Sequence, residues 1–369
     1  MTSISSTRRR TRRPRTATFA AFAGLVHLAT GCSVIGGDGS DPESGASQEG
    51  TGSVVRVVTH DSFALPDELI EQFETETGYA VEVSAPGDGG ALVNQLILTK
   101  DAPLGDVAYG VDNTFASRAI TEEVFASYSS PALPSSAEQY LVPGSDALTP
   151  VDIGDVCLNV DREWFAEAGI AEPTTFEDLL EPEYANLTVV SNPATSSPGL
   201  AMLVATIGAF GEDGFAQYWA GLRENGLEIT SGWSDSYYVD FSGSEGQGDR
   251  PIVLSYSTSP AFEVTEGEAE SPTGALLETC FRQVEYVGVI EGAANPEGGQ
   301  AWVDFMLSTD VQAALPESMF VYPVDDQVEL PGYWVEHAPL SPAPFEVGPE
   351  EIAAGRDAWI QTWTETVID

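Results

Sequence analysis

The chain is poor in positively charged and in metal-binding side chains. Its 369 residues include 14 Lys and Arg against 58 Asp and Glu, which gives a formal net charge of −44, and Lys100 is the single lysine. Nucleic-acid binding without sequence preference needs a basic surface that displaces counterions, so this composition argues against it. Three cysteines and three histidines argue against a disulfide-dense small fold, a multi-zinc protein and a His-rich metal site. We expect no bound metal and no cofactor.

Long apolar runs are also scarce. After the first thirty residues the sequence has no run of about 20 apolar residues, the length that a membrane-spanning helix needs. Hydrophobic residues nevertheless make up 42% of the chain, which is enough to build a packed core. The sequence therefore predicts a globular body.

The first 31 residues have the pattern of an export signal. Six of the 14 basic residues lie within the first fifteen positions, and no acidic residue precedes Asp38. A mostly apolar run follows at positions 17–29, and small residues lead from it to Cys32. Basic, apolar and small segments in this order are typical of a signal peptide. The alternative is a basic arm without fixed structure, which leaves the apolar run unexplained.

Residues 28–32, Leu-Ala-Thr-Gly-Cys, resemble a bacterial lipobox, in which the cysteine becomes the lipidated first residue of the mature protein. The mature chain would then keep 8 basic side chains against 58 acidic ones. Residues 32–52 are rich in Gly, Ser and acidic residues and cannot bury a core, so they predict a flexible tether. We expect an exported protein that is anchored to the outer face of the cell membrane through a lipid on Cys32.

Beyond residue 53 the sequence alternates strand and helix patterns. Strands are expected at 54–58, 80–83, 106–109, 187–190, 227–229, 252–254 and 284–289. Helices are expected at 66–77, 89–100, 198–210, 214–223 and 349–364. This alternation predicts an α/β protein with an open, largely parallel sheet, and the length suggests about two domains.

In open α/β sheets, ligands bind beyond the carboxyl ends of the strands, so the segments after the strands are the candidate site. These segments combine small hydroxyls, carboxylates and aromatic rings. Ser196, Ser197 and Pro198 have the pattern of a helix start, whose free N–H groups favour an anion; the alternative is an ordinary helix cap. Asp61, Asp88, Asp112 and Asp235 could instead hold a cation beside aromatic faces, or serve only as loop formers.

Several of these segments stand in a recognisable order and spacing. They are Thr-His-Asp-Ser-Phe at 59–63, Gly-Asp-Gly at 87–89, Val-Asp-Asn at 111–113, Thr-Ser-Ser-Pro-Gly-Leu at 195–200, Gly-Trp-Ser at 232–234 and Leu-Ser-Tyr-Ser-Thr-Ser-Pro-Ala at 254–261. Segments 321–324 and 358–360 continue the pattern. Together they resemble the thiamine-binding periplasmic proteins, the substrate-binding components of thiamine ABC importers, over nearly all of residues 54–363.

The resemblance implies a two-lobed type II periplasmic-binding-protein fold of the ferric-binding-protein type, with a ligand cleft between the lobes. It implies a monomer that binds thiamine or thiamine phosphates, delivers them to an ABC permease and its ATPase, and carries out no catalysis. The positions that match the family's ligand site are His60, Asp61, Asp88, Ser196, Ser197, Gly199, Trp233, Tyr256, Ser259, Phe262 and Phe320.

The resemblance also implies roles for these residues. Asp88 would hold the charged or amino part of the ligand, and Ser196, Ser197 and Gly199 would line its phosphate or hydroxyethyl end. His60 and Phe262 stand where the family more often has tyrosine, and Phe320 stands about where it has tryptophan. The aromatic cage is thus kept in kind but altered at three positions.

Other function classes fit the sequence less well. Ser-His-Asp catalysis would need His60 or His337, and neither lies in a nucleophile motif. A ferric-ion binder of the same fold would use a tyrosine pair, for which Tyr237 and Tyr238 are candidates, although neighbours on a helix are expected to point apart. A polyamine or sulfate binder is a further alternative.

The two cysteines of the globular body, Cys157 and Cys280, lie on strand-like stretches where the chain should cross between lobes. A disulfide between them and two separate buried thiols are both compatible with an exported chain. We expect residues 53–155 and 284–332 to form lobe one. Residues 156–283 and 333–369 would then form lobe two.

Overall fold

The computed structural model describes residues 53–243, 248–264 and 270–369. The predicted signal peptide (1–31), the lipidated Cys32 and the tether (32–52) lie outside the described residues.

The first part of the fold is a β-α-β-α-β unit, as the hydrophobic pattern predicts. It consists of β1 (Val54–Thr59), α1 (Asp67–Thr77), β2 (Ala80–Ser84), α2 (Gly89–Leu98) and β3 (Val107–Asp112). Strand β1 pairs in parallel with both β2 and β3. Helix α1 ends at Gly78, whose φ of 75° places it in the left-handed conformation that closes a helix.

A second parallel unit follows in the middle of the chain. It consists of β5 (Thr188–Ser191), α5 (Ser197–Phe210), α6 (Phe215–Glu224), β6 (Glu228–Thr230) and β7 (Ile252–Tyr256). Strand β5 pairs in parallel with β6 and with β7. These elements begin and end within a few residues of the expected ones.

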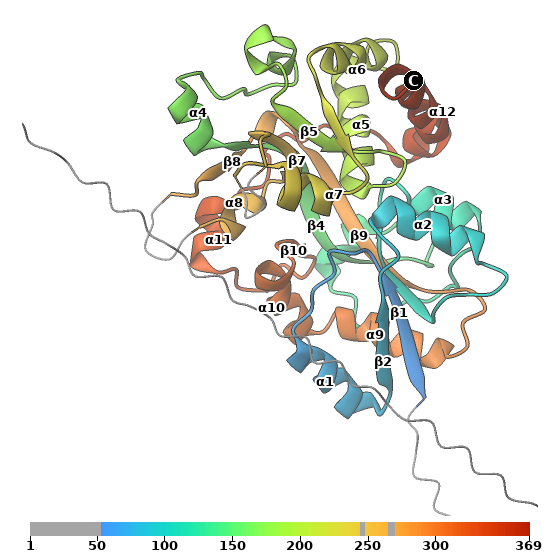
Figure 1. The fold of residues 1–369 in the computed structure, drawn as a ribbon. Helices are drawn as coiled ribbons and strands as arrows, with labels where there is room; N and C mark the ends of the chain where they lie inside the picture. The colour runs from blue at the N-terminus through green and yellow to red at the C-terminus, as the bar shows by residue number, and fades with distance from the viewer. Residues whose placement is uncertain (1–52, 244–247, 265–269) are drawn as a thin grey trace, which may run out of the picture. The chain divides into compact units, whose positions relative to one another are not determined.

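Two long strands, β4 (Thr149–Asp161) and β9 (Phe281–Val289), join the two parallel units into one ten-stranded sheet (Figure 1). The order along the sheet is β2-β1-β3-β9-β4-β7-β5-β6, and the short strands β8 (Thr273–Ala275) and β10 (Tyr322–Pro323) pair with β4. The pairs β3–β9, β9–β4 and β4–β7 are antiparallel. The sheet is therefore mixed, and the expectation of a largely parallel sheet holds only on the two sides of this central pair.

The remaining elements cover the sheet or form its connections. The further helices are α3 (Ala116–Thr121), α4 (Arg162–Ala168), α7 (Trp233–Asp235), α8 (Ser259–Phe262), α9 (Pro296–Met306), α10 (Thr309–Ser318), α11 (Gly332–His337) and α12 (Pro349–Val367). Short 3-10 turns occupy Ser135–Tyr140, Asp178–Leu180, Pro182–Tyr184 and Leu277–Thr279, and Ser236–Asp240 is a π-helical turn.

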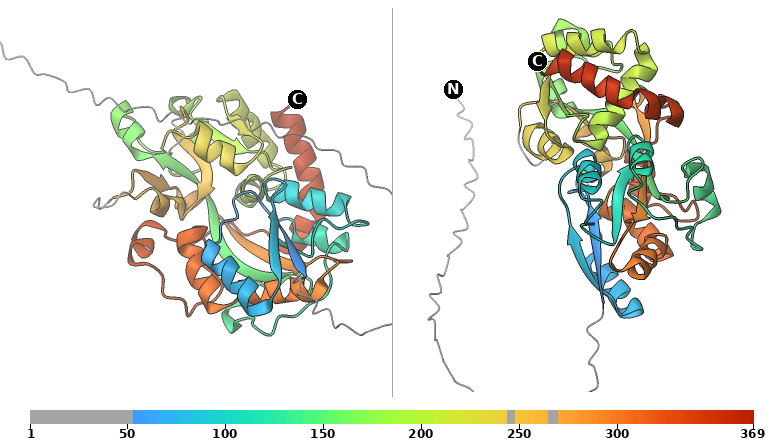
Figure 2. Two further views of the ribbon diagram at one scale, coloured as in Figure 1. Left: turned by 60° about the horizontal axis from the view of Figure 1, so that its bottom comes forward. Right: turned by 90° about the vertical axis from the view of Figure 1, so that its right-hand side faces the viewer.

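The C-terminal helix α12 packs on α6, as Figure 2 shows from two sides. The ring of Trp363 lies edge-on to that of Trp219 at a centroid distance of 5.7 Å, and both side chains are fully buried. Among the described helices no single one has the length and hydropathy to cross a membrane. The one pair that meets this test together, α5 and α6, is bent by 118°.

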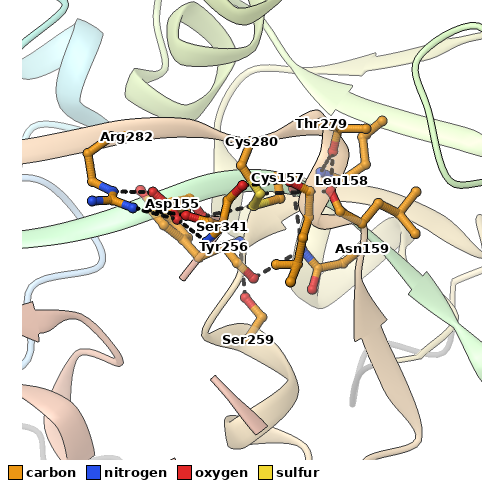
Figure 3. Close-up of a disulfide and its surroundings, with 12 residues drawn as sticks. Asp155, Cys157, Leu158, Asn159, Tyr256, Ser259, Thr279, Cys280, Arg282 and Ser341 are labelled. Carbon is orange, nitrogen blue, oxygen red and sulfur yellow. Dashed lines mark hydrogen bonds and ion pairs between the residues drawn. A yellow bond between two sulfur atoms is a disulfide. The ribbon is translucent and has the colours of Figure 1, made fainter. Parts of the chain in front are cut away.

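A disulfide joins Cys157 of β4 to Cys280, which immediately precedes β9 (Figure 3). Close to it, the guanidinium of Arg282 pairs with the fully buried carboxylate of Asp155, which also accepts the N–H of Ser341 at 2.6 Å. The disulfide and the ion pair both tie β4 to β9. Figure 3 shows the two near each other, on the strands that lie in the middle of the strand order.

Candidate ligand-binding site

One cavity of about 320 Å³ opens beside the carboxyl ends of the parallel strands. Residues that follow β1, β2, β5, β6 and β7 line it, together with β9 and the segment between α10 and β10. This is the position at which open α/β sheets bind ligands. Its lining includes nine of the expected site residues: His60, Asp61, Asp88, Ser197, Trp233, Tyr256, Ser259, Phe262 and Phe320.

Aromatic rings form one wall of the cavity. Trp233 stacks on Tyr237 with ring centroids 5.0 Å apart and an angle of 19° between the rings, and it contacts the edge of Tyr238 at 5.3 Å. Farther along, Phe262 and Phe320 meet edge to face at 4.9 Å. These flat faces can stack on a planar ligand and can attract a cation.

A chain of hydroxyl groups holds the tryptophan in place. The indole N–H of Trp233 donates to Ser255 Oγ at 2.9 Å, and Ser255 Oγ lies 2.7 Å from Ser259 Oγ. Ser259 Oγ in turn accepts the N–H of Tyr256 at 3.2 Å. Ser259 therefore contacts the backbone of Tyr256 and, through Ser255, supports the indole of Trp233, as well as lining the cavity.

The backbone at Phe320 adopts an unusual conformation. Its φ of 55° lies in the left-handed region, which a bulky side chain rarely occupies. Such residues cluster at ligand sites, where the surrounding structure holds them. Here the ring of Phe320 contacts those of Phe262 at 4.9 Å and Trp334 at 5.7 Å, and the residue lines the cavity.

The charged groups of the cavity are almost all acidic. Asp61, Asp88 and Glu285 line it, and its described lining contains neither lysine nor arginine. Burial raises the pKa of Asp61, and the charge of Asp88 raises it further. The repulsion between these two carboxylates favours a positively charged group beside them.

His60 faces the acidic side of the cavity. Its Nδ1 accepts the N–H of Ser62 at 3.2 Å, and its Nε2 lies 3.6 Å from a carboxylate oxygen of Glu285. The ring approaches Gly110 so closely that a Cβ there would lie 2.2 Å from the ring, and Gly110 has a φ of 99°. Only glycine fits both the conformation and the contact.

Behind His60 lies a buried acid pair that sequence reasoning did not identify. The hydroxyl of Tyr109 donates to Asp152 at 2.6 Å and to Glu285 at 3.2 Å. Burial, followed by the charge of Glu285, raises the pKa of Asp152 well above its ordinary value. The two acids come from β4 and β9, and only the pairing of these distant strands brings them together.

Asp88 lines the cavity and accepts hydrogen bonds from three backbone N–H groups. Its Oδ1 accepts the N–H of Gly89 at 2.5 Å and that of Ser197 at 3.0 Å, and its Oδ2 accepts the N–H of Trp233 at 2.9 Å. The carboxylate thus joins the beginnings of α2, α5 and α7.

Ser196 and Gly199 do not line the cavity. Ser196 is fully buried and caps α5, because its Oγ accepts the N–H of Gly199 at 3.3 Å and donates to Ser191 Oγ at 2.8 Å. A Cβ on Gly199 would lie 2.5 Å from the carbonyl oxygen of Ser191. Both residues therefore shape the start of α5 against the end of β5, and the structure places Ser197 alone of this group at the cavity.

Tyr237 and Tyr238 both line the cavity, and their rings meet edge-on at 5.3 Å. Both residues belong to the π-helical turn Ser236–Asp240. The hydroxyl of Tyr237 donates to Glu263 at 2.8 Å. Tyr237, at 1% exposure, serves mainly as the surface on which Trp233 stacks.

The sequence matches the family of bacterial extracellular solute-binding proteins over residues 102–342. It is 30% identical to the thiamine-binding periplasmic protein of Escherichia coli K12 over 322 residues, which cover 85% of this chain and 93% of that protein. The structure superposes on a solved periplasmic thiamin-binding protein with a TM-score of 0.75 at 29% identity. That alignment covers 86% of this chain and 96% of the other.

A ferric-binding protein from Campylobacter jejuni shares the fold at 15% identity, with a TM-score of 0.69, over 85% of this chain and 99% of that protein. The architecture is thus the type II periplasmic-binding-protein fold that the sequence resemblance implies. With this fold and these relatives, the chain belongs to the bacterial extracellular solute-binding proteins, in the same family as the thiamine-binding periplasmic proteins.

Proposed function

We propose that this protein is the extracytoplasmic substrate-binding component of an ABC importer, and that it binds thiamine in the cavity between Trp233 and the acidic residues. The observation that carries the proposal is a cavity with an aromatic wall and three carboxylates but no lysine or arginine in its described lining. The relatives with the highest similarity named above are thiamine-binding proteins, which supports the same ligand.

Thiamine matches this cavity in shape and charge. Its thiazolium ring carries a permanent positive charge, which aromatic faces and nearby carboxylates stabilise. Its aminopyrimidine ring is flat and rich in hydrogen-bonding edges, and the hydroxyls of Ser197 and Ser259 border the same space. A cavity of about 320 Å³ is within the usual range for small-molecule sites.

Isothermal titration calorimetry on the purified mature protein tests the proposal. We expect saturable binding of thiamine and no binding of spermidine or sulfate under the same conditions. Absence of heat with thiamine at millimolar concentration would contradict the proposal. A visible charge-transfer colour on addition of ferric iron would instead favour an iron site at Tyr237 and Tyr238.

We further propose that the chain closes on its ligand by a hinge between two lobes, residues 53–155 with 284–332 and residues 156–283 with 333–369. The change of partner along β4 supports this division. Its residues 149–156 pair with β9, whereas residues 156–160 pair with β7. Small-angle scattering should report a smaller radius of gyration with thiamine than without it, and an unchanged radius would count against closure.

We propose that the protein binds its ligand without catalysis, because the relatives named above are binding proteins and the described lining of the cavity is aromatic and acidic. We propose that the mature protein is a monomer held on the outer face of the cell membrane by a lipid on Cys32, where it delivers thiamine to a permease and its ATPase. Replacement of Cys32 by Ser should move the protein from the membrane fraction to the soluble fraction. Retention of the variant in the membrane fraction would exclude this anchor.

A further inference from the structure

Three carboxyl groups lie in one row across the middle of the sheet. Glu285 of β9 is in register with Asp112 of β3 on one side and with Asp152 of β4 on the other. Residues in register on neighbouring strands direct their side chains to the same face, and like charges in such positions repel each other. Asp112 and Asp152 are fully buried, whereas Glu285 keeps 8% exposure and lines the cavity. The middle acid of this row is therefore the one that a ligand can reach.

The two outer acids bind protons more tightly than ordinary aspartates do. Burial raises the pKa of Asp112 to about 7, and the charge of Glu285 acts in the same direction. Burial also raises the pKa of Asp152 well above its ordinary value, and the charge of Glu285 again adds to the effect. The row therefore concentrates its negative charge on Glu285, at the cavity, rather than on the buried outer acids.

The described residues around Glu285 offset little of its charge. The hydroxyl of Tyr109 has one proton, which it directs to Asp152 at 2.6 Å and less closely to Glu285 at 3.2 Å. A second contact is with His60, whose Nε2 lies 3.6 Å from the carboxylate, beyond hydrogen-bond distance. This nitrogen is buried and has no hydrogen-bond partner among the described residues.

The other two carboxylates of the cavity are placed differently. Asp88 accepts three backbone N–H groups, whose partial positive charges offset its own. Asp61 is exposed, so water and salt screen its charge. Of the three, Glu285 is the one that combines burial with few hydrogen-bond donors.

We propose that Glu285 is a specificity-determining residue of this cavity, the counter-ion for the positive charge of the ligand. This inference rests on the proposed function and deepens it, because the permanent charge of a thiazolium ring is the group that Glu285 would hold. Attraction between opposite charges is strongest where water is excluded, and a largely buried carboxylate beside aromatic rings meets this condition. Glu285 should therefore make the protein prefer a cationic ring to a neutral ring of the same shape.

The test compares two ligands that differ in charge. One is thiamine, and the other is its analogue with a neutral thiophene ring in place of the thiazolium. Titration calorimetry at one pH and one ionic strength gives both dissociation constants, and their ratio measures the preference for positive charge. A variant that only disturbs the shape of the cavity should weaken the binding of both ligands and leave this ratio unchanged.

The wild-type protein is expected to bind thiamine at least tenfold more tightly than the neutral analogue. Glu285→Gln removes the charge and keeps the size of the side chain, so it should reduce this preference at least fivefold. An unchanged preference in Glu285→Gln, or no preference in the wild type, would overturn the proposal. If Glu285→Gln does not fold, Glu285→Met supplies an uncharged side chain of similar length that needs no hydrogen-bond partner, and it should have the same effect.

Two neighbouring acids provide matched controls. Asp152→Asn replaces an acid that holds its proton by a neutral amide, and Asp152 does not line the cavity, so the preference should stay as in the wild type. Asp61→Asn removes an exposed carboxylate that does line the cavity, so it should reduce the preference less than Glu285→Gln does. A loss in either control as large as that in Glu285→Gln would overturn the role of Glu285.

A simpler pair of ligands separates this inference from the proposed function. If the wild-type protein binds neither thiamine nor its neutral analogue, the proposed ligand is wrong. In that case 1-methylnicotinamide and nicotinamide take their place, as flat rings with and without a positive charge. The wild type should bind the cation more tightly, and Glu285→Gln should bind both compounds equally. Equal binding of the two by the wild type, or binding of neither, would overturn the role of Glu285.

Discussion

At the scale of single residues, Trp233 combines three contacts that define the cavity wall. Its ring stacks on Tyr237, its indole N–H donates to Ser255, and its backbone N–H donates to Asp88. Truncation of the side chain removes the first two contacts and leaves the third. The ring can therefore be tested without disturbing the backbone contact to Asp88.

Trp233→Ala should weaken thiamine binding more than tenfold, because a stacked and desolvated aromatic face contributes about 2 kcal/mol to the binding of a cation. Trp233→Phe keeps an aromatic face and should lose less. Titration calorimetry of the three proteins checks both statements. If Trp233→Ala and wild type had the same dissociation constant, Trp233 would not contribute to thiamine binding.

Asp112 is a second residue whose environment has a measurable consequence. It is fully buried at the end of β3, and its Oδ1 accepts hydrogen bonds from the N–H and hydroxyl of Thr114 and from the N–H of Phe115. Burial raises the pKa of Asp112 to about 7, although these hydrogen bonds act in the opposite direction. The folded state therefore binds this proton more tightly than the unfolded state does.

Folding stability should consequently fall as pH rises from about 4, the ordinary pKa of Asp, to about 7. Asp112→Asn keeps the accepting oxygen and has no proton to lose. The free energy of unfolding of Asp112→Asn minus that of the wild type should therefore be about 2–3 kcal/mol larger at pH 7.5 than at pH 5. Urea unfolding at both pH values measures this, and a difference between the proteins that does not change with pH would contradict it.

At the scale of elements, the start of α5 shows that a hydroxyl-rich motif can cap a helix as well as line a ligand site. The motif Ser196-Ser197-Pro198 has the hydroxyls and the proline of a helix start. The structure uses Ser196 as the cap and directs Ser197 to the cavity. The sequence pattern identified the helix start, but it could not separate the capping hydroxyl from the one at the cavity.

Ser196→Ala should lower the free energy of unfolding by about 1 kcal/mol, the usual contribution of a helix cap. Ser308→Ala is the control, since Ser308 caps α10 through the N–H of Val311 at 3.3 Å and does not line the cavity. Denaturant unfolding should give similar losses for both variants. If Ser196→Ala instead weakened thiamine binding as strongly as Trp233→Ala without a change in stability, Ser196 would be a ligand contact.

The element that sequence patterns predicted least well is β4. All thirteen of its residues are buried, so it lacks the alternation of exposed and buried side chains. It also contains the buried polar residues Asp152, Asp155 and Asn159, which interrupt its apolar pattern. Their partners come from distant segments, for example Tyr109 for Asp152 and Arg282 for Asp155. The local sequence does not show that these buried polar groups have hydrogen-bond and ion-pair partners.

At the scale of the whole molecule, the disulfide between Cys157 and Cys280 closes a long loop around the middle of the chain. The two cysteines are 123 residues apart. Cross-links over long loops restrict the unfolded state, and removal of such a bond from an exported protein typically costs about 2–5 kcal/mol. The disulfide should therefore stabilise the folded chain, in which β4 pairs with β9, in addition to the ion pair of Arg282 and Asp155.

The double variant Cys157→Ser, Cys280→Ser should melt at a lower temperature than the wild-type protein. Addition of a reductant should lower the melting temperature of the wild type and leave that of the double variant unchanged. Thiol titration under denaturing conditions, in a Cys32→Ser background, should find no reactive thiol in the absence of reductant. Two reactive thiols per chain would exclude the bond.

The sequence by itself determined the α/β alternation, the elements of the two parallel units and the segments that carry the site, because hydrophobic periodicity and turn residues are local signals. Composition also determined the excess of acidic residues, and most of those that the structure describes are not buried. The family resemblance added the fold type and the set of residues around the cavity.

Only the tertiary structure decided which of these residues meet. The buried pair of Asp152 and Glu285 depends on the pairing of β4 with β9. The hydrogen bond from the indole N–H of Trp233 to Ser255 joins residues that lie 22 positions apart in the sequence. The three N–H groups around Asp88 come from helices that begin at three distant points of the chain. Charge and hydrogen bonding act over a few ångströms in space, so their partners are fixed by the fold rather than by proximity along the sequence.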